Sequence, residues 1–302
     1  MKRTVKIIFS SFGMLVLAAV LVLTGITFFH YPHYRREKQV VVPEKPADAS
    51  IRVMSCNVRC LTPFDLGKRS WFYRANLIVN NIRSNAPTVI GFQEVTKWQY
   101  SYLTDTLPGF DSVITYRDKM FNSEGCPVFY RSDLYTLIDK NSFWLSETPD
   151  EMSKDWGAAC YRICSYVILE EKTSGQRFVV FNTHLDHVSD EARINGINVV
   201  LDKIKAFGSL PAVIMGDFNA KEASETYKSA TANFLDAKYQ TENAVAGATY
   251  QNWGQKPDNE NIDYFMISKK GFTVEEYKVI SETYDGVYPS DHFPIFTVIS
   301  LK

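Results

Sequence analysis

Residues 213–220 read VIMGDFNA, and the prediction of the fold starts from this stretch. The apolar run 212–215 is typical of a buried strand that stops at Gly216, where glycine lets the backbone turn. Asp217 and Asn219 follow with one residue between them, so at strand spacing they project to the same side. The carboxylate can hold or move a proton, and the carboxamide can hold a phosphate oxygen or a water. The alternative is an Asx turn that only closes the strand.

The composition predicts a folded chain with a sizeable core. The chain has 302 residues, with 14% aromatic and 22% charged residues, which fits one large α/β or sandwich domain as well as two domains. The first 49 residues hold seven basic and three acidic side chains, which leaves 26 basic and 31 acidic ones, a net charge of -5, in the remainder. An acidic domain is poorly suited to gripping long nucleic acid without sequence preference.

The five cysteines argue against a complete disulfide framework, because their number is odd. Cys56 and Cys60, and likewise Cys160 and Cys164, are separated by three residues. A membrane-tethered zinc protein is therefore an alternative interpretation, but zinc knuckles usually have two intervening residues and a matching His pair is missing. Together with Cys126, we expect buried, unreactive thiols.

An uncharged stretch of 23 residues, 7–29, begins after Lys6 and ends before His30. A helix needs about 20 apolar residues to cross a hydrocarbon core of about 30 Å, so this stretch predicts a membrane span. A cleaved signal peptide is the alternative, but its apolar region is shorter and ends in a small-residue cleavage site. Aromatic residues of the kind found at membrane interfaces surround the far end of the stretch: Phe28, Phe29, Tyr31 and Tyr34.

The charges that flank this anchor do not decide its orientation. Lys2, Arg3 and Lys6 precede the span, and three basic residues between 35 and 38 follow it, so the two sides nearly tie. Because a short N-terminal tail usually stays inside, we expect a single-pass protein of the cell membrane with its main domain outside the cytoplasm. The predicted organisation is a tail and anchor at 1–38, a linker at 39–50 and a globular domain at 51–302.

Within that domain, strand-like and helix-like patterns alternate. We expect strands at 51–56, 89–93, 110–116, 128–130, 165–170, 177–183, 212–215, 262–267 and 293–299. We expect helices at 69–85, 97–107 and 190–207, the last with Asp190 as a candidate N-cap, and a long loop at 143–161.

Polar residues recur where the apolar strands end. They are Asn57, Glu94, His184, Asp217 with Asn219, Asp263, and Asp291 with His292. A turn or cap explains any one of them, but hydrophobic strands do not need all of them. Carboxylates gathered at one edge of a sheet suit Mg²⁺, which takes few carboxylates and keeps waters and substrate phosphates.

Six motifs in this order resemble those of the endonuclease/exonuclease/phosphatase superfamily, from about residue 51 to the C-terminus. They are SCNVR at 55–59, FQEV at 92–95, NTHLDH at 182–187, MGDFNA at 215–220, IDYFMIS at 262–268 and SDHFPI at 290–295. Two further segments, CPVFYR at 126–131 and FWLSETPD at 143–150, with Trp156 and Arg162 after them, resemble bacterial members near the deadenylase and nocturnin-like branch.

The resemblance implies a four-layer α/β sandwich, an α+β arrangement of two mainly antiparallel sheets with helices outside. It also implies hydrolysis of a phosphoester by water with Mg²⁺ or Mn²⁺. By matching position, Glu94 would be the chief metal ligand, helped by Asn57 and Asp291.

The resemblance also implies the catalytic roles. Asp217 would handle a proton or position water, and Asn219 would hold a phosphate oxygen. His292 would sit against the scissile phosphate, with Asp263 fixing its tautomer. His184 would contact another phosphate oxygen.

Three further residues are candidate substrate contacts. Glu124 would be the carboxylate partner of His184. His187 is either a second site histidine or a solvent-facing one, and Arg162 is either a substrate contact or a structural ion pair.

The favoured function is a membrane-anchored phosphodiesterase or phosphatase that acts on a small phosphorylated molecule, a lipid headgroup or a nucleotide. A membrane-tethered nuclease for DNA or RNA is an alternative that requires a basic groove, and an inactive binding module of the same fold is another. We predict no protein partner. Recognition would come from loops at 59–70, 117–127, 141–162 and 241–261, where Trp144, Trp156 and Trp253 either stack on substrate or, as we prefer, pack under their loops.

Overall fold

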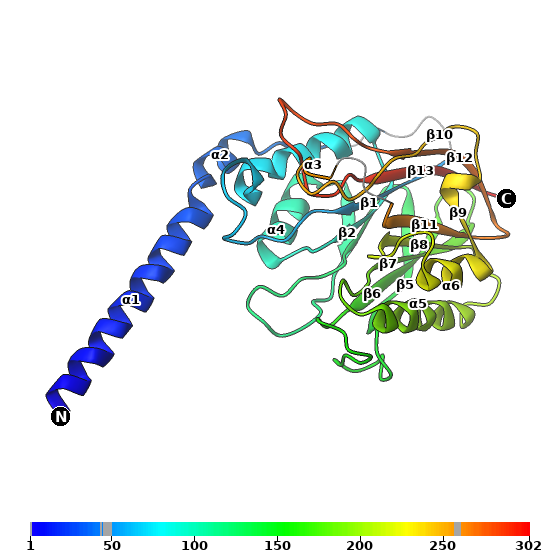
Figure 1. Cartoon of the computed structure of the whole chain (residues 1–302). Coiled ribbons are helices and arrows are strands. Elements are labelled where there is room, and N and C mark those ends of the chain that lie inside the picture. Colours follow the sequence, from blue (N-terminus) through cyan, green and yellow to red (C-terminus); the bar gives the residue numbers. More distant parts are fainter. Residues whose placement is uncertain (1, 43, 45–49, 257–260) are drawn as a thin grey trace.

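Two β-sheets pack face to face at the centre of the molecule (Figure 1), in a computed structural model that describes residues 2–42, 44, 50–256 and 261–302. The first sheet has seven strands. Their order is β10 (Ala244–Val245), β12 (Phe272–Val279), β13 (Ile295–Leu301), β1 (Ile51–Asn57), β2 (Val89–Gln93), β4 (Val128–Arg131) and β3 (Phe110–Val113). β1 runs parallel to β2, and β10 runs parallel to β12; the other neighbours are antiparallel.

The second sheet has six strands. Their order is β5 (Tyr135–Trp144), β6 (Ile163–Glu171), β7 (Arg177–His184), β8 (Ala212–Asp217), β11 (Asp263–Ser268) and β9 (Phe234–Asp236). Only β7 and β8 are parallel among the paired neighbours in the described residues. The mainly antiparallel character predicted from the sequence is therefore confirmed.

Helices cover the outer face of each sheet. α3 (Trp71–Asn85) and α4 (Lys97–Thr106) pack on the first sheet. α5 (Asp190–Lys205) and α6 (Glu225–Asn233) pack on the second, and short 3₁₀ turns lie at Gly67–Arg69 and Ala237–Tyr239. The order helix, sheet, sheet, helix confirms the four-layer sandwich (Figure 1).

The alternation of side chains along β8 divides its residues between two cores. Val213 and Met215 point into the core between the sheets, whereas Ala212 and Ile214 point toward the outer helices. Because successive side chains alternate, Asp217 falls on the inner side, toward the first sheet. Both sides of this strand are buried, which explains why it reads as a continuous apolar run.

Gly216 has a different role from the one expected. β8 does not stop there but continues to Asp217. A Cβ at Gly216, whose φ is 141°, would lie 1.9 Å from the carbonyl oxygen of Thr183 in β7. Glycine is therefore needed for the close approach of the parallel neighbour, and the chain turns later, at Asn219 with φ 49°.

Four other expectations about the elements need correction. The N-cap of α5 is Ser189, whose side chain accepts a hydrogen bond from the Ala192 N–H, and not Asp190. Residues 143–144 belong to β5 rather than to a loop. The strand was not recognised because it is a largely exposed edge strand and lacks an apolar pattern. The strand expected at 110–116 ends at Val113. Neither β12 nor α6 was expected; β12 alternates polar and apolar residues and pairs with β13.

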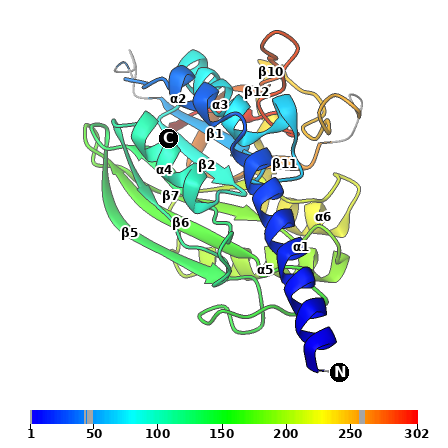
Figure 2. The same ribbon diagram turned by 90° about the vertical axis from the view of Figure 1, so that its left-hand side faces the viewer.

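The N-terminal helix α1 (Lys2–Phe28) projects from the domain and is followed by α2 (Tyr31–Glu37) (Figures 1 and 2). The stretch Phe12–Glu37 contains a window long and apolar enough to cross a membrane, and no residue of that window is buried. Membrane anchors and signal sequences share this property.

Three of the four aromatic residues expected only at a membrane interface pack on the domain, whereas the fourth, Phe29, is exposed. The Phe28 ring lies 5.1 Å from that of Phe72 and 5.7 Å from that of Trp98. Tyr34 lies 4.8 Å from Tyr102, and His33 stacks on Tyr73 at 4.4 Å. The domain contacts therefore begin before residue 38.

Part of the expected linker is also docked on the domain. Val41 is buried, and its N–H donates to the Thr106 carbonyl oxygen. The carbonyl oxygen of Glu44 accepts a hydrogen bond from Arg131. Residues 43 and 45–49 of the expected linker lie outside the described residues.

We expect a chain that lacks residues 1–38 to unfold at a lower temperature than a chain that lacks only residues 1–26. Loss of Phe28, Tyr31 and Tyr34 removes aromatic contacts that are worth about 0.5–1.5 kcal/mol per pair beyond area burial. Thermal unfolding followed by circular dichroism measures the difference, and Tyr34→Ala in the longer chain should account for part of it. Equal midpoints would mean that the α2 contacts do not stabilise the domain.

Candidate active site

Polar side chains at strand ends of both sheets meet in one pocket of about 450 Å³. Nine of the eleven predicted site residues line it: Glu94, Glu124, Arg162, His184, His187, Asp217, Asn219, Asp291 and His292. The other two, Asn57 and Asp263, hydrogen-bond to residues that line it. Strand alternation explains the position of four of these residues. Each of them continues the inward-facing series of its strand: Asn57, His184, Asp217 and Asp263.

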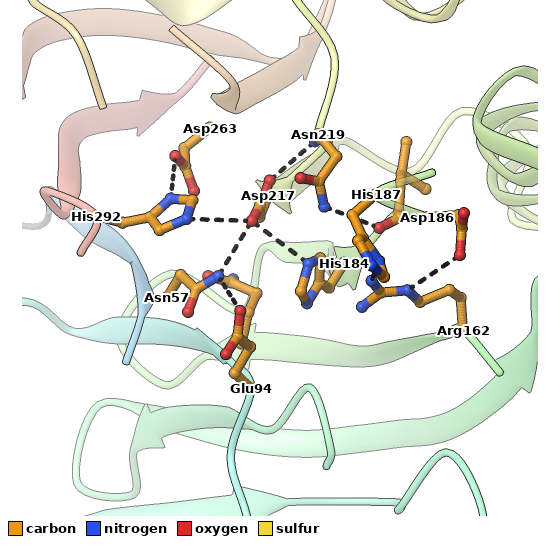
Figure 3. Close-up of polar contacts among 12 residues, drawn as sticks. Asn57, Glu94, Arg162, His184, Asp186, His187, Asp217, Asn219, Asp263 and His292 are labelled. Atoms are coloured by element: carbon orange, nitrogen blue, oxygen red, sulfur yellow. Dashed lines mark hydrogen bonds and ion pairs between the residues drawn. The ribbon is translucent and has the colours of Figure 1, made fainter. Parts of the chain in front are cut away.

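The Asn57 side chain connects the two sheets (Figure 3). Its Nδ2 donates to Glu94 Oε1 and to Asp217 Oδ2, each at 3.1 Å. Its Oδ1 accepts a hydrogen bond from the Arg59 N–H at 2.9 Å. The amide thus sets the separation of two carboxylates that come from different sheets.

Glu94 follows β2 directly and has a left-handed backbone, with φ 61°. Such a conformation is costly for a residue other than glycine and persists where surrounding contacts hold it. Here Glu94 Oε2 accepts a hydrogen bond from the Cys60 N–H at 2.9 Å. Burial acts to raise the pKa of Glu94, but the Cys60 N–H, the Arg59 charge and Asn57 together lower it. The carboxylate therefore stays ionised.

His292 lies between two carboxylates (Figure 3). Its Nδ1 donates to Asp263 Oδ2 at 2.9 Å, and its Nε2 lies 3.7 Å from Asp217 Oδ2. Burial acts to lower the pKa of His292, but the charges of Asp263 and Asp217 outweigh it and raise the pKa to about 10. The ring is an imidazolium at neutral pH.

Asp217 is buried, and burial with the nearby Asp263 charge raises its pKa to about 7. Its Oδ1 accepts the Asn219 N–H at 2.8 Å, which forms the Asx turn considered as an alternative. Asn219 Nδ2 donates to the Leu185 carbonyl oxygen. Asp217 and Asn219 therefore form the Asx turn and also line the pocket.

The expected pairing of Glu124 with His184 is not present. Glu124 Oε1 accepts a hydrogen bond from Arg117 Nη2 at 2.9 Å, while His184 Nε2 lies 3.4 Å from Asp217 Oδ2. Burial and the Glu94 charge raise the pKa of Glu124 to about 7. Burial and the Arg162 charge lower the pKa of His184, so this imidazole is neutral.

Arg162 is buried and lines the pocket beside two partners (Figure 3). Its Nη2 donates to His187 Nδ1 at 3.0 Å, and its Nε lies 3.8 Å from Asp186 Oδ2. Asp186, which the sequence analysis did not single out, accepts hydrogen bonds from four backbone N–H groups of the loops around 159 and 188. It holds both loops and orients Arg162.

Three further pocket residues were missed: Arg59, Arg117 and Tyr250. Arg59 pairs with Asp65 at 3.0 Å, and the Tyr250 ring lies 4.9 Å from that of His292. Arg59 and Asp186 both lie inside quoted motifs, so the motifs contained a signal for them. Arg117 and Tyr250 lie outside the quoted motifs, in two of the loops expected to recognise substrate.

The tryptophans and three of the five cysteines fit the structural interpretations. Trp144 Nε1 donates to the Arg117 carbonyl oxygen, and Trp253 packs 5.3 Å from the Arg74 guanidinium. Among the described residues, no tryptophan lines the pocket and no pair of cysteines forms a disulfide. Three cysteines are buried as expected; Cys60 and Cys160 line the pocket instead.

The donor set fits a hard divalent cation. Glu94 and Asp291 both line the pocket, and after burial the Glu94 charge is the main factor that raises the pKa of Asp291. Carboxylate oxygens are the ligands that Mg²⁺ favours, and a bound cation would relieve the repulsion between these two groups. Among described residues, the tightest metal-type cluster is Asp217, Asp263 and His292, with ligand atoms within 4.8 Å of one another. The negative charge of the Asp217 and Asp263 carboxylates in this cluster is already compensated by the His292 imidazolium, and the cluster contains no cysteine.

The sequence matches the Endonuclease/Exonuclease/phosphatase family over residues 54–292. An endonuclease/exonuclease/phosphatase structure from Bacteroides vulgatus is similar at a TM-score of 0.79 and 31% identity, covering 84% of this chain and 100% of that one. The mannosyl-6-phosphatase of Bacteroides thetaiotaomicron is similar at a TM-score of 0.76 and 30% identity, with coverage of 84% and 100%.

Among curated proteins, the Drosophila melanogaster nocturnin is 24% identical over 273 residues, which are 75% of this chain and 41% of that protein. The Ccr4 exoribonuclease subunit of Candida albicans is 24% identical over 298 residues, covering 77% of this chain and 38% of that protein. The chain thus spans about two fifths of these two relatives. The predicted likeness to the nocturnin-like branch is confirmed.

We expect Asp263→Asn to lower the pKa of His292 from about 10 toward its ordinary value of 6.5, because the largest charge that opposes burial is then lost and only Asp217 and Asp291 still raise the pKa. An NMR titration of the His292 ring in metal-free protein measures the pKa. Asp202→Asn, which removes a carboxylate from the exposed side of α5, serves as the control. An unchanged titration in Asp263→Asn would show that Asp263 does not stabilise the charged ring.

Proposed function

Because the chain belongs to the endonuclease/exonuclease/phosphatase family, whose members hydrolyse phosphoesters, we propose that it is a phosphoester hydrolase that uses Mg²⁺ or Mn²⁺ and an attacking water. The observation that carries the proposal is the Asn57 bridge between Glu94 and Asp217. It brings the ionised carboxylate of one sheet close to a carboxyl of the other sheet that can exchange a proton at neutral pH.

Glu94, with Asn57 and Asp291, would hold the cation. Glu94 is ionised and fixed by two donors, and the Asn57 Oδ1 accepts a single hydrogen bond in the described residues, which leaves a lone pair. When bound, a divalent ion supplies Lewis-acid neutralisation of charge on the phosphate oxygens.

Asp217 would position the attacking water and take its proton. A pKa of about 7 supports this role, because general acid–base groups work best when their pKa lies near the operating pH. Asn219 would turn its Nδ2 toward a phosphate oxygen, giving up its present bond to a backbone carbonyl.

The imidazolium of His292 would donate to a phosphate oxygen and stabilise the negative charge that develops there. Asp263 holds Nδ1 and leaves Nε2 directed toward Asp217 and the pocket. The neutral ring of His184 would donate to a second oxygen. His187, Arg162 and Glu124 would contact the rest of the substrate.

A small phosphorylated molecule, a lipid headgroup or a nucleotide fits this pocket better than long nucleic acid. Each of its three arginines has an acidic partner: Asp65 for Arg59, Glu124 for Arg117 and Asp186 for Arg162. A groove that tracks a nucleic-acid backbone needs unpaired positive charge. Similarity to a mannosyl-6-phosphatase at 30% identity supports a small ester, whereas the Ccr4 similarity supports the nuclease alternative. The inactive-module alternative is disfavoured because all eleven predicted residues gather at one pocket.

The proposal includes a single-pass anchor. The apolar helix α1 would lie in the cell membrane, with the catalytic domain outside the cytoplasm. The support is the length and composition of α1 and its exposure along the apolar window.

We expect Glu94→Gln to reduce EDTA-sensitive hydrolysis of bis-p-nitrophenyl phosphate by about 100-fold or more, because it removes a charge that neutralises the cation. The matched control is Glu225→Gln on the exposed face of α6, which should retain full activity. Near-normal turnover in Glu94→Gln, with unchanged circular dichroism, would exclude the proposed metal site.

A substrate panel tests the proposed class. It comprises mannose 6-phosphate, p-nitrophenyl phosphate, phosphoinositides, sphingomyelin, RNA, and single- and double-stranded DNA, each with Mg²⁺ and with EDTA. We expect Mg²⁺-dependent turnover of small esters and little cleavage of duplex DNA, because the arginines are already paired. Preferential cleavage of nucleic acid would establish the nuclease alternative instead.

A further inference from the structure

Exposed apolar side chains gather on the loops that line the pocket. Phe64 and Phe121 are 80% and 91% exposed, and Leu66, Met120 and Val188 are also largely exposed. Single apolar residues are normal on a protein surface, but a group on one face marks an interaction site. We call these five residues the mouth residues, and their three loops, 59–70, 117–125 and 185–189, the mouth loops.

The mouth loops are connected to the pocket and to one another. Each contributes a pocket residue: Cys60, Glu124 and His187. The Asn122 side chain donates to the Leu61 carbonyl oxygen at 3.0 Å, which joins the first two loops. The mouth residues therefore lie on loops that also form the walls of the pocket.

The first of these loops lies against the end of α1. Gly67 lines a surface pocket together with Gly25, Ile26 and Phe29 of the helix end. In Figure 1 the light-blue loop lies beside α2, where α1 leaves the domain, and the blue-green loop before β4 extends on that same side. Figure 2 looks onto this side, with α1 in front of the domain. The end of α1 and the first two mouth loops thus lie on the same side of the domain.

Basic residues accompany the mouth residues. Lys68 and Lys119 are exposed, and in the part of the chain that the structure describes neither has an ion-pair partner. Aromatic side chains flanked by lysines are typical of surfaces that enter the headgroup region of an anionic bilayer.

We propose that the mouth loops dock on the bilayer that receives α1, so that the pocket opens at the lipid–water interface. The proposal rests on the membrane anchoring given under the proposed function. We favour the bilayer as the occupant because Gly67, in the first mouth loop, lines a surface pocket together with residues at the end of α1. Docking would hold the domain by two attachments, α2 and the mouth loops, and substrate would enter the pocket from the membrane surface.

The test uses the full chain reconstituted in vesicles that contain anionic lipid, with and without bromine on the acyl chains. Phe121→Trp adds a reporter at the mouth, and Tyr239→Trp adds one at another largely exposed aromatic position, 62% against 91%, in the 3₁₀ turn Ala237–Tyr239 after β9 of the second sheet. We expect brominated lipid to quench most of the emission added at 121 and none of that added at 239.

Phe64→Trp repeats the measurement on the neighbouring loop, so that a failure of one variant to fold leaves the test intact. Emission at 64 and 121 that is unaffected by brominated lipid would overturn the proposal, and crosslinking between copies at these positions would assign the surface to a second copy instead. No turnover is measured, so an inactive chain would give the same answer. Failure of the docking proposal is therefore distinguishable from failure of the proposed catalysis.

Discussion

Side-chain amides that cross between the two sheets hold the candidate site together. Asn57 reaches from β1 to Asp217, and behind it Gln93 Nε2 donates to Asn182 Oδ1 at 2.6 Å. Asn182 also donates to two backbone carbonyl oxygens near the first sheet, those of Phe92 and Pro127. A buried amide that lost these bonds would cost about 1–3 kcal/mol per unpaired group. The relative position of the sheets, and with it every distance in the pocket, is fixed by these directional contacts rather than by apolar packing alone.

The pocket keeps neighbouring acids in different protonation states. Glu94 is held ionised by its donors, whereas burial raises the pKa of Glu124 and of Asp217 to about 7. Pairs of titratable groups whose pKa values are pushed apart are the means by which a site divides acid and base work. Burial affects all three carboxyl groups, and Asp217 accepts the same kinds of donor as Glu94, a backbone N–H and the Asn57 amide. The difference comes from the neighbouring charges, because Arg59 lowers the pKa of Glu94, whereas Asp263 raises that of Asp217 and Glu94 raises that of Glu124.

How far the sequence predicts this structure depends on how each residue is placed. Strand alternation requires Asn57 and Asp217 to face the space between the sheets, so polar residues after apolar runs were sufficient to predict that they meet. The partners of Glu124 were not predictable in this way, since they depend on loop conformations that no period encodes. The strand β5 was missed in part for a related reason, because an edge strand exposed on one face needs no apolar pattern. The N-cap at Ser189 was misplaced by one residue, within the usual error of helix boundaries.

The hydrogen bond from Asn57 to Asp217 joins residues that are 160 positions apart, and His292 reaches the same pocket from just before β13. Contacts of such long range form late, because the entropy of closing long loops must be offset before they contribute. The site also needs β13, which closes the first sheet against β1. An incompletely synthesised chain that lacks this strand would contain most of the motifs and yet have no assembled pocket. The pocket would thus assemble only after β13 has been synthesised and has paired with β1.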